Sequence, residues 1–332
     1  MNLIIPMAGI GKRMRPHTLL IPKPLLKIAG KTIIERIVED IKNSCGKIIE
    51  EVHFIIGDFG PDVEKKLIEI ADKINAKGYI HYQKEALGTA HAVYCAKDGL
   101  KNEILIAFAD TLFDGNFEIG TEDEAIIWTM EVKNPENYGV VTTDINNNIN
   151  DFIEKPMNVI SNLAIIGIYY FKNGKRLKED IKLSIDKGLK TCDEFQLTDN
   201  LKNLKNEGLI FKCKKIREWL DCGNKYEFLK SNKRILELGK YVNEIPVIKN
   251  SLIAENVSFG KNVEITNSNI GPYVSIGDNC IVFDSKVKNS NISNECKITE
   301  CNLIDSMIGS NNILSECSGK VNFGDFIEYE GI

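Results

Sequence analysis

Residues 3–16 read Leu-Ile-Ile-Pro-Met-Ala-Gly-Ile-Gly-Lys-Arg-Met-Arg-Pro, an apolar run that passes directly into a glycine-rich loop. The run is short and uncharged, as in a buried strand of a parallel sheet. Glycines that follow such a strand let backbone N–H groups approach phosphate oxygens closely. The loop is not GxGxxG, because Met14 stands where the third glycine belongs, and no GxxxxGK[ST] P-loop is present. The pattern therefore predicts an α/β phosphate-binding fold outside those two motif classes.

Strand and helix patterns alternate through the first 110 residues, which indicates βαβ units and a parallel sheet. The middle of the chain is richer in strands, so we expect a Rossmann-like mixed sheet. The expected strands span 3–7, 52–56, 79–83, 103–110, 125–132, 138–143, 149–154 and 163–171. The expected helices span 32–41, 63–74, 89–97, 176–186, 198–205 and 225–238.

The composition changes after about Pro246, where helical periodicity stops and aliphatic residues recur about every six positions. Ile276-Gly277-Asp278-Asn279-Cys280 and Ile308-Gly309-Ser310-Asn311-Asn312 are typical of hexapeptide repeats. We expect a short left-handed parallel β-helix, with the aliphatic residue inward and glycine at the tight corner. A two-sheet β domain is the alternative. The predicted domains are 1–244 and 245–332.

The chain has 332 residues, a net charge of −5 and nine cysteines without a CxxC pair. These features predict a cytoplasmic protein with reduced thiols and no nucleic-acid partner. The sequence begins directly with the first apolar run, so no signal peptide is expected. No apolar run reaches 18 residues, so neither a transmembrane helix nor a membrane partner is expected.

Two cations are candidates for binding a polyphosphate. Arg13 follows the glycines of the first loop, and Lys23 stands between two prolines that restrict its backbone. A long cation on a stiff loop suits a phosphate chain, whereas the alternative is a surface lysine between turn prolines.

Three polar side chains are candidates for binding the rest of a nucleotide. The Gln83 amide offers a donor and an acceptor, which matches the imide edge of uracil or thymine. Asp110 ends an expected buried strand, where ligands bind in open α/β sheets, and Asp221 ends another expected strand. A carboxylate there suits Mg²⁺ bound to phosphates, and the two could share one ion. Each could also be an ordinary turn residue.

Glu154 and Lys155 lie at the end of another expected strand and should alternate across it. Glutamate suits sugar hydroxyls, and lysine suits a phosphate. Alone, this run is more often a solvated strand end. Similarly, Gly88 and Thr89 could form a helix N-terminus with Thr89 as the cap.

In this order and spacing, the segments resemble the sugar-phosphate nucleotidyltransferase family, which includes glucose-1-phosphate thymidylyltransferases and uridylyltransferases. The resemblance rests on Gly-x-Gly-x-Arg, Pro-Lys-Pro, Leu-Gly-Thr-Ala, the strand-end Asp, Glu-Lys-Pro and Trp-x-Asp-x-Gly over residues 1–240. It departs from the family at Lys12, where Thr is common, and at Ala109-Asp110-Thr111.

The resemblance implies a role for each candidate residue. The nucleotide would be bound by Ala8, Gly9, Gly11, Arg13, Gln83, Gly88 and Thr89. The sugar phosphate would be bound by Tyr138, Gly139, Glu154, Lys155 and Gly167. Mg²⁺ would be bound by Asp110 and Asp221. The residues acting directly in catalysis would be Arg13, Lys23, Asp110 and Lys155.

The implied reaction joins a nucleoside triphosphate to a sugar-1-phosphate and releases pyrophosphate, with glucose-1-phosphate and dTTP or UTP as the expected pair. Mannose-1-phosphate with GTP and a non-catalytic sensor of the same fold are alternatives. An acyltransferase activity in the tail is disfavoured, because no histidine follows His91. We expect the tail to support packing or homo-oligomer assembly without joining the chemistry.

Overall fold

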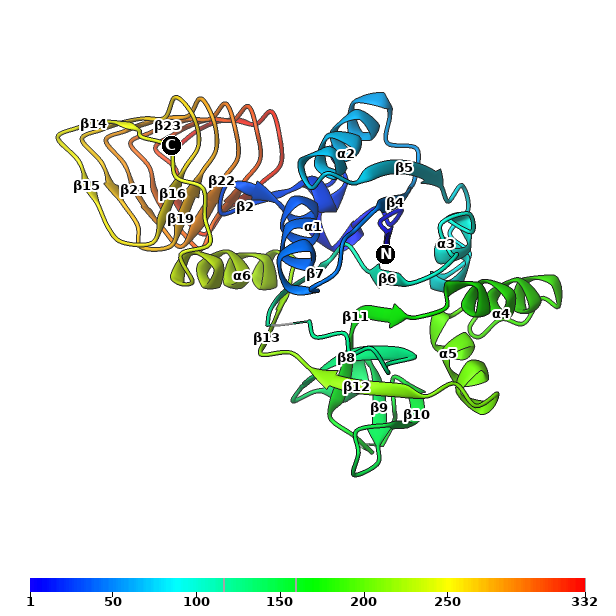
Figure 1. The fold of residues 1–332 in the computed structure, drawn as a ribbon. Coiled ribbons are helices and arrows are strands. Elements are labelled where there is room, and N and C mark those ends of the chain that lie inside the picture. Colours follow the sequence, from blue (N-terminus) through cyan, green and yellow to red (C-terminus); the bar gives the residue numbers. More distant parts are fainter. Residues whose placement is uncertain (116, 159, 332) are drawn as a thin grey trace. The chain divides into compact units, whose positions relative to one another are not determined.

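The computed structural model describes residues 1–115, 117–158 and 160–331, which form two compact units (Figure 1). The sheet unit comprises residues 1–9 and 37–219, and the β-helix unit comprises residues 10–36 and 220–332. The glycine-rich loop is therefore divided between them after Gly9. Among the described residues, no helix combines the length and apolar character needed to cross a bilayer.

The sheet unit is built on a nine-stranded mixed sheet with the order β10-β9-β11-β6-β1-β4-β5, and β8 joins β11 to β12. Strands β6, β1, β4 and β5 are parallel to their neighbours in this series, whereas β11, β9 and β10 are added antiparallel. The strands are β1 (Asn2–Pro6), β4 (Glu51–Ile56), β5 (Lys77–Tyr82), β6 (Ile104–Ala107), β8 (Ala125–Glu131), β9 (Gly139–Thr143), β10 (Ile149–Glu154), β11 (Leu163–Phe171) and β12 (Phe211–Lys215). The predicted mixed α/β fold is confirmed.

Helices α2 (Pro61–Lys73), α3 (Thr89–Cys95), α4 (Gly174–Asp186) and α5 (Leu197–Asn206) belong to the sheet unit. α2 packs against β5, while α3, α4 and α5 contact one another. The apolar faces of these three helices and the sheet share one buried core, which includes Val93, Ile181 and Leu201 beside Ile106 and Phe171. Burying these side chains supplies the main stabilisation of the unit.

The strand predicted for residues 103–110 is shorter than expected, because β6 ends at Ala107. Phe108 donates its N–H to the carbonyl of Gly167, and Thr111 closes a turn onto Phe108. Asp110 therefore lies in a turn between β6 and β7 (Thr111–Asp114). Opposite this turn, the pairing of β11 with β8 shifts register between Ile165 and Tyr169. Such irregularities redirect side chains beside functional sites.

The tail is a parallel β-helix with three sheets of stacked short strands. The first sheet holds β14 (Val247–Lys249), β17 (Glu264–Thr266), β20 (Ile281–Phe283), β23 (Lys297–Thr299), β26 (Ile313–Ser315) and β29 (Glu328–Glu330). The second holds β15 (Leu252–Ile253), β18 (Asn269–Ile270), β21 (Lys286–Lys288), β24 (Asn302–Ile304) and β27 (Ser318–Gly319). The third holds β16 (Val257–Phe259), β19 (Val274–Ile276), β22 (Ser290–Ile292), β25 (Met307–Ile308) and β28 (Asn322–Phe323). Inward-facing residues such as Ile265, Val282 and Ile298 form its core, which confirms the predicted inward aliphatic positions.

Glycines lie at corners of the β-helix, as expected: Gly271 falls between β18 and β19 with φ of 101°, and Gly277 falls between β19 and β20. Most other left-handed backbone positions of the coils are occupied by asparagine and acidic residues, such as Asn262 and Asn279 with φ of 54° and 55°. Glycine is also needed for stacking between coils. A Cβ at Gly260 would lie 2.5 Å from Oδ1 of Asp278, and one at Gly277 would lie 2.5 Å from Oδ1 of Asn294. Asparagine tolerates the left-handed region because its short polar side chain can bond locally.

The β-helix unit also contains the loop from Ile10 to Arg36 and helix α6 (Lys225–Glu237). The loop holds 3₁₀ turns η1 (Lys12–Met14) and η2 (Lys23–Leu25) and the hairpin of β2 (Lys27–Ile28) and β3 (Lys31–Thr32). It ends where α1 (Ile33–Ser44) begins, at a capping box in which Thr32 and Glu35 exchange side-chain and backbone hydrogen bonds. The remaining elements are η3 (Pro135–Asn137) and β13 (Glu218–Asp221). The proposed domain boundary at 244/245 stays a prediction.

Candidate nucleotide and sugar-phosphate site

Three candidate residues in the sheet unit follow the carboxyl ends of parallel strands. Gly9 comes after β1, Gln83 directly follows β5, and Asp110 lies in the turn after β6. Because β5, β4, β1 and β6 are parallel in one sheet, these ends lie at the same edge. Ala109 also donates its N–H to the Pro6 carbonyl, which joins the Asp110 turn to the end of β1. Ligands of open α/β sheets bind at such an edge.

Gly9 is a glycine that the fold itself does not require. A Cβ added there would have no atom of the described residues within 4 Å, and the φ of Gly9 lies outside the left-handed region. Open space over an accessible backbone is what a close-approaching ligand needs. Ala8, the preceding residue, is half-buried.

Gln83 is held in a definite orientation by its neighbours. Its Nε2 donates to the carbonyl of Gly88 at 3.1 Å and to Nδ1 of His91 at 3.2 Å. Both amide hydrogens are therefore engaged within the protein, which leaves Oε1 as the group to meet a base. Burial lowers the pKa of His91, which favours the neutral ring that accepts this hydrogen bond.

Gly88 and Thr89 are fixed by the segment before α5. Gly88 has φ of 111°, and a Cβ there would lie 2.5 Å from the carbonyl oxygen of Phe195, so only glycine fits. The expectation that Thr89 caps α3 is wrong: Gly88 occupies the N-cap position, and the Thr89 hydroxyl accepts the N–H of Leu197 at 2.9 Å. Residues 195–197 are thus part of the site's support, a role that sequence reasoning missed.

Glu154 and Gly139 lie opposite each other at the ends of β10 and β9. A Cβ at Gly139 would lie 2.9 Å from Oε2 of Glu154, so glycine keeps this position open for the carboxylate. Thr198 donates its hydroxyl to the same oxygen at 3.2 Å. A cavity of about 380 Å³ lies beside Glu154 and Thr198.

The expected alternation of Glu154 and Lys155 across a strand is wrong. β10 ends at Glu154, and Lys155 has a left-handed backbone with φ of 43°. Its N–H donates to the carbonyl of Tyr138 at 3.1 Å. The exposed side chain of Lys155 is therefore directed by this strained turn, and such strain at a non-glycine residue is common at functional sites.

The buried phenol of Tyr169 connects the sugar end to the Asp110 turn. Burial raises the pKa of Tyr169, and the carboxylates of Glu154 and Asp110 raise it further. Both carboxylates therefore act on the same side chain. Gly167, two residues earlier on β11, has φ of 84° and lies next to Phe108 and Thr111 of the turn. The structure thus brings Asp110, Gly167 and Glu154 into one region.

Trp219 is a second residue that sequence reasoning missed as a candidate ligand. Its indole ring stands edge-on to Tyr138, with ring centroids 5.1 Å apart. The indole Nε1 is buried and has no hydrogen-bond partner among the described residues. A buried N–H without a partner costs about 1–3 kcal/mol, and native proteins rarely tolerate it without a reason. The signal available in the sequence was only its position two residues before Asp221.

The other candidates lie together in the β-helix unit. A Cβ at Gly11, whose φ is 60°, would lie 3.1 Å from Cβ of Lys23, so Gly11 packs directly against the lysine. At Gly223, a Cβ would lie 3.4 Å from Nη2 of Arg13 and 2.9 Å from Oδ1 of Asp221. Arg13 and Asp221 therefore both adjoin Gly223. The Gly223 N–H donates to Asp221 at 2.7 Å, and Ser231 of α6 donates to the Asp221 carbonyl.

The family model described as nucleotidyl transferase matches residues 3–237 of this chain. The chain belongs to the nucleotidyl transferase family. It is 33% identical to bifunctional protein GlmU of Methanocaldococcus jannaschii over 94% of this chain and 78% of that relative. It is 28% identical to a glucose-1-phosphate thymidylyltransferase of Streptomyces antibioticus over 94% and 92% of the two chains. The sugar-phosphate nucleotidyltransferase family expected from the motifs is confirmed.

A solved structure from Bacillus anthracis, assigned as a glucose-1-phosphate thymidylyltransferase, shares the fold. The TM-score is 0.60 with 21% identity, covering 74% of this chain and 96% of the other. The nucleotidyl transferase fold is thus found in both chains.

The residues of this nucleotidyl transferase suit only one mode of binding Mg²⁺. Within residues 1–115, 117–158 and 160–331, no group of three or more His, Cys, Asp or Glu side chains could enclose a metal. Mg²⁺ is commonly held by one or two carboxylates together with waters and substrate phosphates. A carboxylate at the ligand-binding edge, such as Asp110, fits binding of this kind, in which waters and phosphates complete the coordination.

Proposed function

We propose that this protein joins a nucleoside triphosphate to a sugar-1-phosphate, and that glucose-1-phosphate with dTTP or UTP is its preferred pair. The observation that carries this is the edge of the sheet unit, along which the open Gly9 backbone, the oriented Gln83 amide and the Asp110 turn all lie. The Glu154–Gly139 pair, linked to Asp110 through Tyr169, offers a separate polar end for a sugar.

In the proposed reaction, an oxygen of the sugar-1-phosphate attacks the α-phosphorus of the triphosphate. The new P–O bond forms as the bond to the β-phosphate oxygen breaks, and pyrophosphate leaves with that electron pair. The attacking phosphate is already ionised, so no general base is required. The main barrier is repulsion between two polyanions, which fixed positive groups reduce. Arg13, Lys23 and Lys155 are the cations proposed for this task, and Mg²⁺ supplies further neutralising charge when bound.

Asp110 and Asp221 are proposed as Mg²⁺ ligands on separate grounds. Asp110 follows β6 at the ligand-binding edge of the sheet unit. Asp221 ends β13, and its carboxylate lies beside Gly223, next to Arg13 in the β-helix unit. Because each assignment rests on its own surroundings, each has its own test.

Mannose-1-phosphate with GTP is a second candidate pair, and one observation favours keeping it. Both hydrogens of the Gln83 amide are engaged by Gly88 and His91, so Oε1 is the group offered to the base. An acceptor suits the ring N–H of uracil and thymine and also that of guanine. Adenine and cytosine present a ring nitrogen acceptor at the corresponding position, so they can donate to Oε1 only through their exocyclic amino groups.

The experiment is a panel of five nucleoside triphosphates against hexose-1-phosphates, with Mg²⁺, scored by pyrophosphate release. We expect turnover with glucose-1-phosphate and dTTP or UTP, weaker turnover with GTP, and little with ATP or CTP. Folded protein that releases no pyrophosphate with any pair would refute the enzyme proposal and favour a sensor of the same fold.

A further inference from the structure

The loop that carries Lys23 is attached to the β-helix on both sides of that lysine. On one side, His17 is buried and its Nε2 lies 3.0 Å from Oδ1 of Asn322 in β28. Because Oδ1 can only accept, Nε2 of His17 donates this hydrogen bond, and burial lowers the pKa of His17, which favours the neutral ring. Pro16, the residue before His17, packs against Gly324 of the β-helix: a Cβ at Gly324 would lie 2.9 Å from the proline Cβ.

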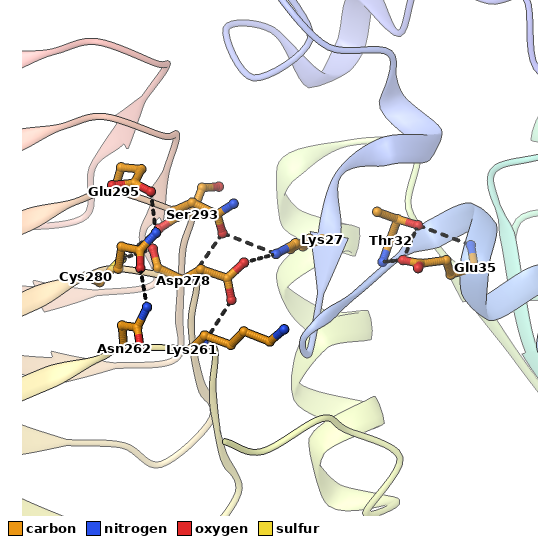
Figure 2. Close-up of polar contacts among 11 residues, drawn as sticks. Lys27, Thr32, Glu35, Lys261, Asn262, Asp278, Cys280, Ser293 and Glu295 are labelled. Carbon is orange, nitrogen blue, oxygen red and sulfur yellow. Dashed lines mark hydrogen bonds and ion pairs between the residues drawn. The ribbon is translucent and has the colours of Figure 1, made fainter. Parts of the chain in front are cut away.

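On the other side, Lys27 extends from β2 to a corner of the β-helix (Figure 2). Its Nζ lies 2.6 Å from Oδ2 of Asp278 and 3.3 Å from Oδ1 of Asn294. Asn291 donates its amide to the carbonyl of Lys27 at 3.3 Å. The contact therefore fixes both the side chain and the backbone of this residue.

A third contact passes through α6. Oδ1 of Asn232, which is almost fully buried, accepts the N–H of Ala29 at 3.0 Å and the hydroxyl of Ser275 at 2.8 Å. One side chain thus connects the hairpin after Lys23 to β19 of the β-helix. A helix fixed in this way keeps the hairpin from sliding along the coils.

The position of Lys23 follows from these attachments. It lies six residues after His17 and four before Lys27, in the short turn η2. Gly11 packs against its Cβ from the first part of the same loop. The loop between the anchors is short, so a shift at either anchor must move Lys23.

We propose that the β-helix positions the phosphate-handling loop, and that Asp278 and Asn322 are positioning residues that act on catalysis through Lys23. This proposal rests on the proposed function of Lys23. It assigns the tail a role in the reaction rate without placing a tail residue at a substrate.

Stability alone does not explain the Lys27–Asp278 contact. Both side chains are about one-third exposed, at 33% and 31%, and ion pairs of such exposure contribute little, typically about 0.2–1 kcal/mol. Loss of geometry costs more, because a misplacement of about 1 Å in a catalytic group can reduce a rate about 100-fold. A modest effect on melting with a large effect on rate is therefore the signature expected of a positioning contact.

The test uses the full chain with Asp278→Asn and Asn322→Ala. Asp278→Asn keeps an oxygen to accept the Lys261 N–H, which now bonds Oδ1 at 2.9 Å, and removes only the charge facing Lys27. We expect kcat to fall about tenfold or more in each variant, with the KM for sugar-1-phosphate unchanged. The matched control is Asp186→Asn, which breaks the Lys182–Asp186 pair of equal 2.6 Å length on α4 and should leave kcat unchanged.

Rescue separates positioning from simple damage. Lys27→Asp and Asp278→Lys should each reduce kcat, and the double variant with exchanged charges should recover most of it. Hydrogen exchange of the segment 17–27, measured without any ligand, should be faster in Asp278→Asn and Asn322→Ala than in the wild type. Wild-type kcat in both variants, or unchanged exchange of this segment, would overturn the proposal. Because exchange needs no turnover, it tests the anchors even if the proposed reaction itself is not observed.

Discussion

Nε2 of Gln83 lies 3.2 Å from Nδ1 of His91, and this contact settles which face of the amide is left for a ligand. With the second hydrogen donated to Gly88, only Oε1 is available. Base selection by Gln83 is therefore expected to depend on His91 as well.

The first prediction concerns this pair. Gln83→Ala should reduce kcat/KM for dTTP, UTP and GTP about tenfold more than for ATP and CTP, because only the first three offer a ring N–H to Oε1. His91→Leu should give a smaller change in the same direction, since Gln83 keeps its bond to Gly88. Steady-state rates with the five triphosphates check both. Equal losses for all five triphosphates would place Gln83 outside the base site.

The second prediction concerns metal binding. Asp110→Asn and Asp221→Asn should each lower kcat about 100-fold or more and raise the Mg²⁺ concentration needed for half-maximal rate. The Asp221 variant keeps the amide oxygen that can accept the Gly223 N–H, so its turn should persist. Mg²⁺ titrations of activity, with Asp186→Asn as control, measure the effect. A variant with a normal rate and Mg²⁺ response identifies its aspartate as a turn residue.

The third prediction concerns the indole N–H of Trp219, which has no hydrogen-bond partner in the described part of the chain. Trp219→Phe keeps a ring to pack against Tyr138 but removes the donor. We expect the KM for sugar-1-phosphate to rise about threefold to tenfold, as for loss of one hydrogen bond, with no fall in melting temperature. Trp128→Phe is the control, because Trp128 is fully buried against Phe117 and its truncation should lower the melting temperature only. An unchanged KM in the Trp219 variant argues that no ligand uses this N–H.

Much of the architecture was predictable from local pattern. The expected strands at 149–154 and 163–171 match β10 and β11 at both ends, because their apolar periodicity is bounded by turn residues. The β-helix was also predictable, since its repeat forces an inward residue in every strand. Gly88 could be identified as a motif residue because its backbone conformation, with φ of 111°, requires glycine.

The remaining features depend on contacts between distant segments. Thr89 could be predicted as a helix cap, but its hydroxyl bonds Leu197, more than one hundred residues later. Strand β12 was missed, because its register comes from pairing with β8 and three of its five residues are lysines. The anchoring of Lys27 to Asp278 is likewise invisible in a single sequence, where each residue reads as a surface charge.

A pair of histidines on the neighbouring strands β4 and β5 is outside the candidate site and leads to the fourth prediction. His53 is almost fully buried, and its Nδ1 lies 2.9 Å from Nε2 of His81, while its Nε2 lies 3.0 Å from Glu51. Tyr79 stacks on the His53 ring at 4.8 Å. These contacts are satisfied when both rings are neutral, with each Nε2 donating. A proton added to Nδ1 of His53 would face the Nε2 donor of His81.

The free energy of unfolding should therefore depend on pH. Burial lowers the pKa of His53 and outweighs the attraction of Glu51 and Asp98, and Lys101 lowers this pKa further. Burial also lowers the pKa of His81 and outweighs the attraction of Asp98. In the unfolded chain, histidine titrates at about pH 6.5. The unfolded state then binds more protons below that pH, so stability is complete above it and falls as the pH drops toward the folded-state values. Urea midpoints between pH 5 and 8 should decline toward acid in the wild type and decline less in His53→Gln/His81→Gln. A wild-type midpoint that is constant across this range, or an equal decline in the variant, would show that the cluster does not favour neutral rings.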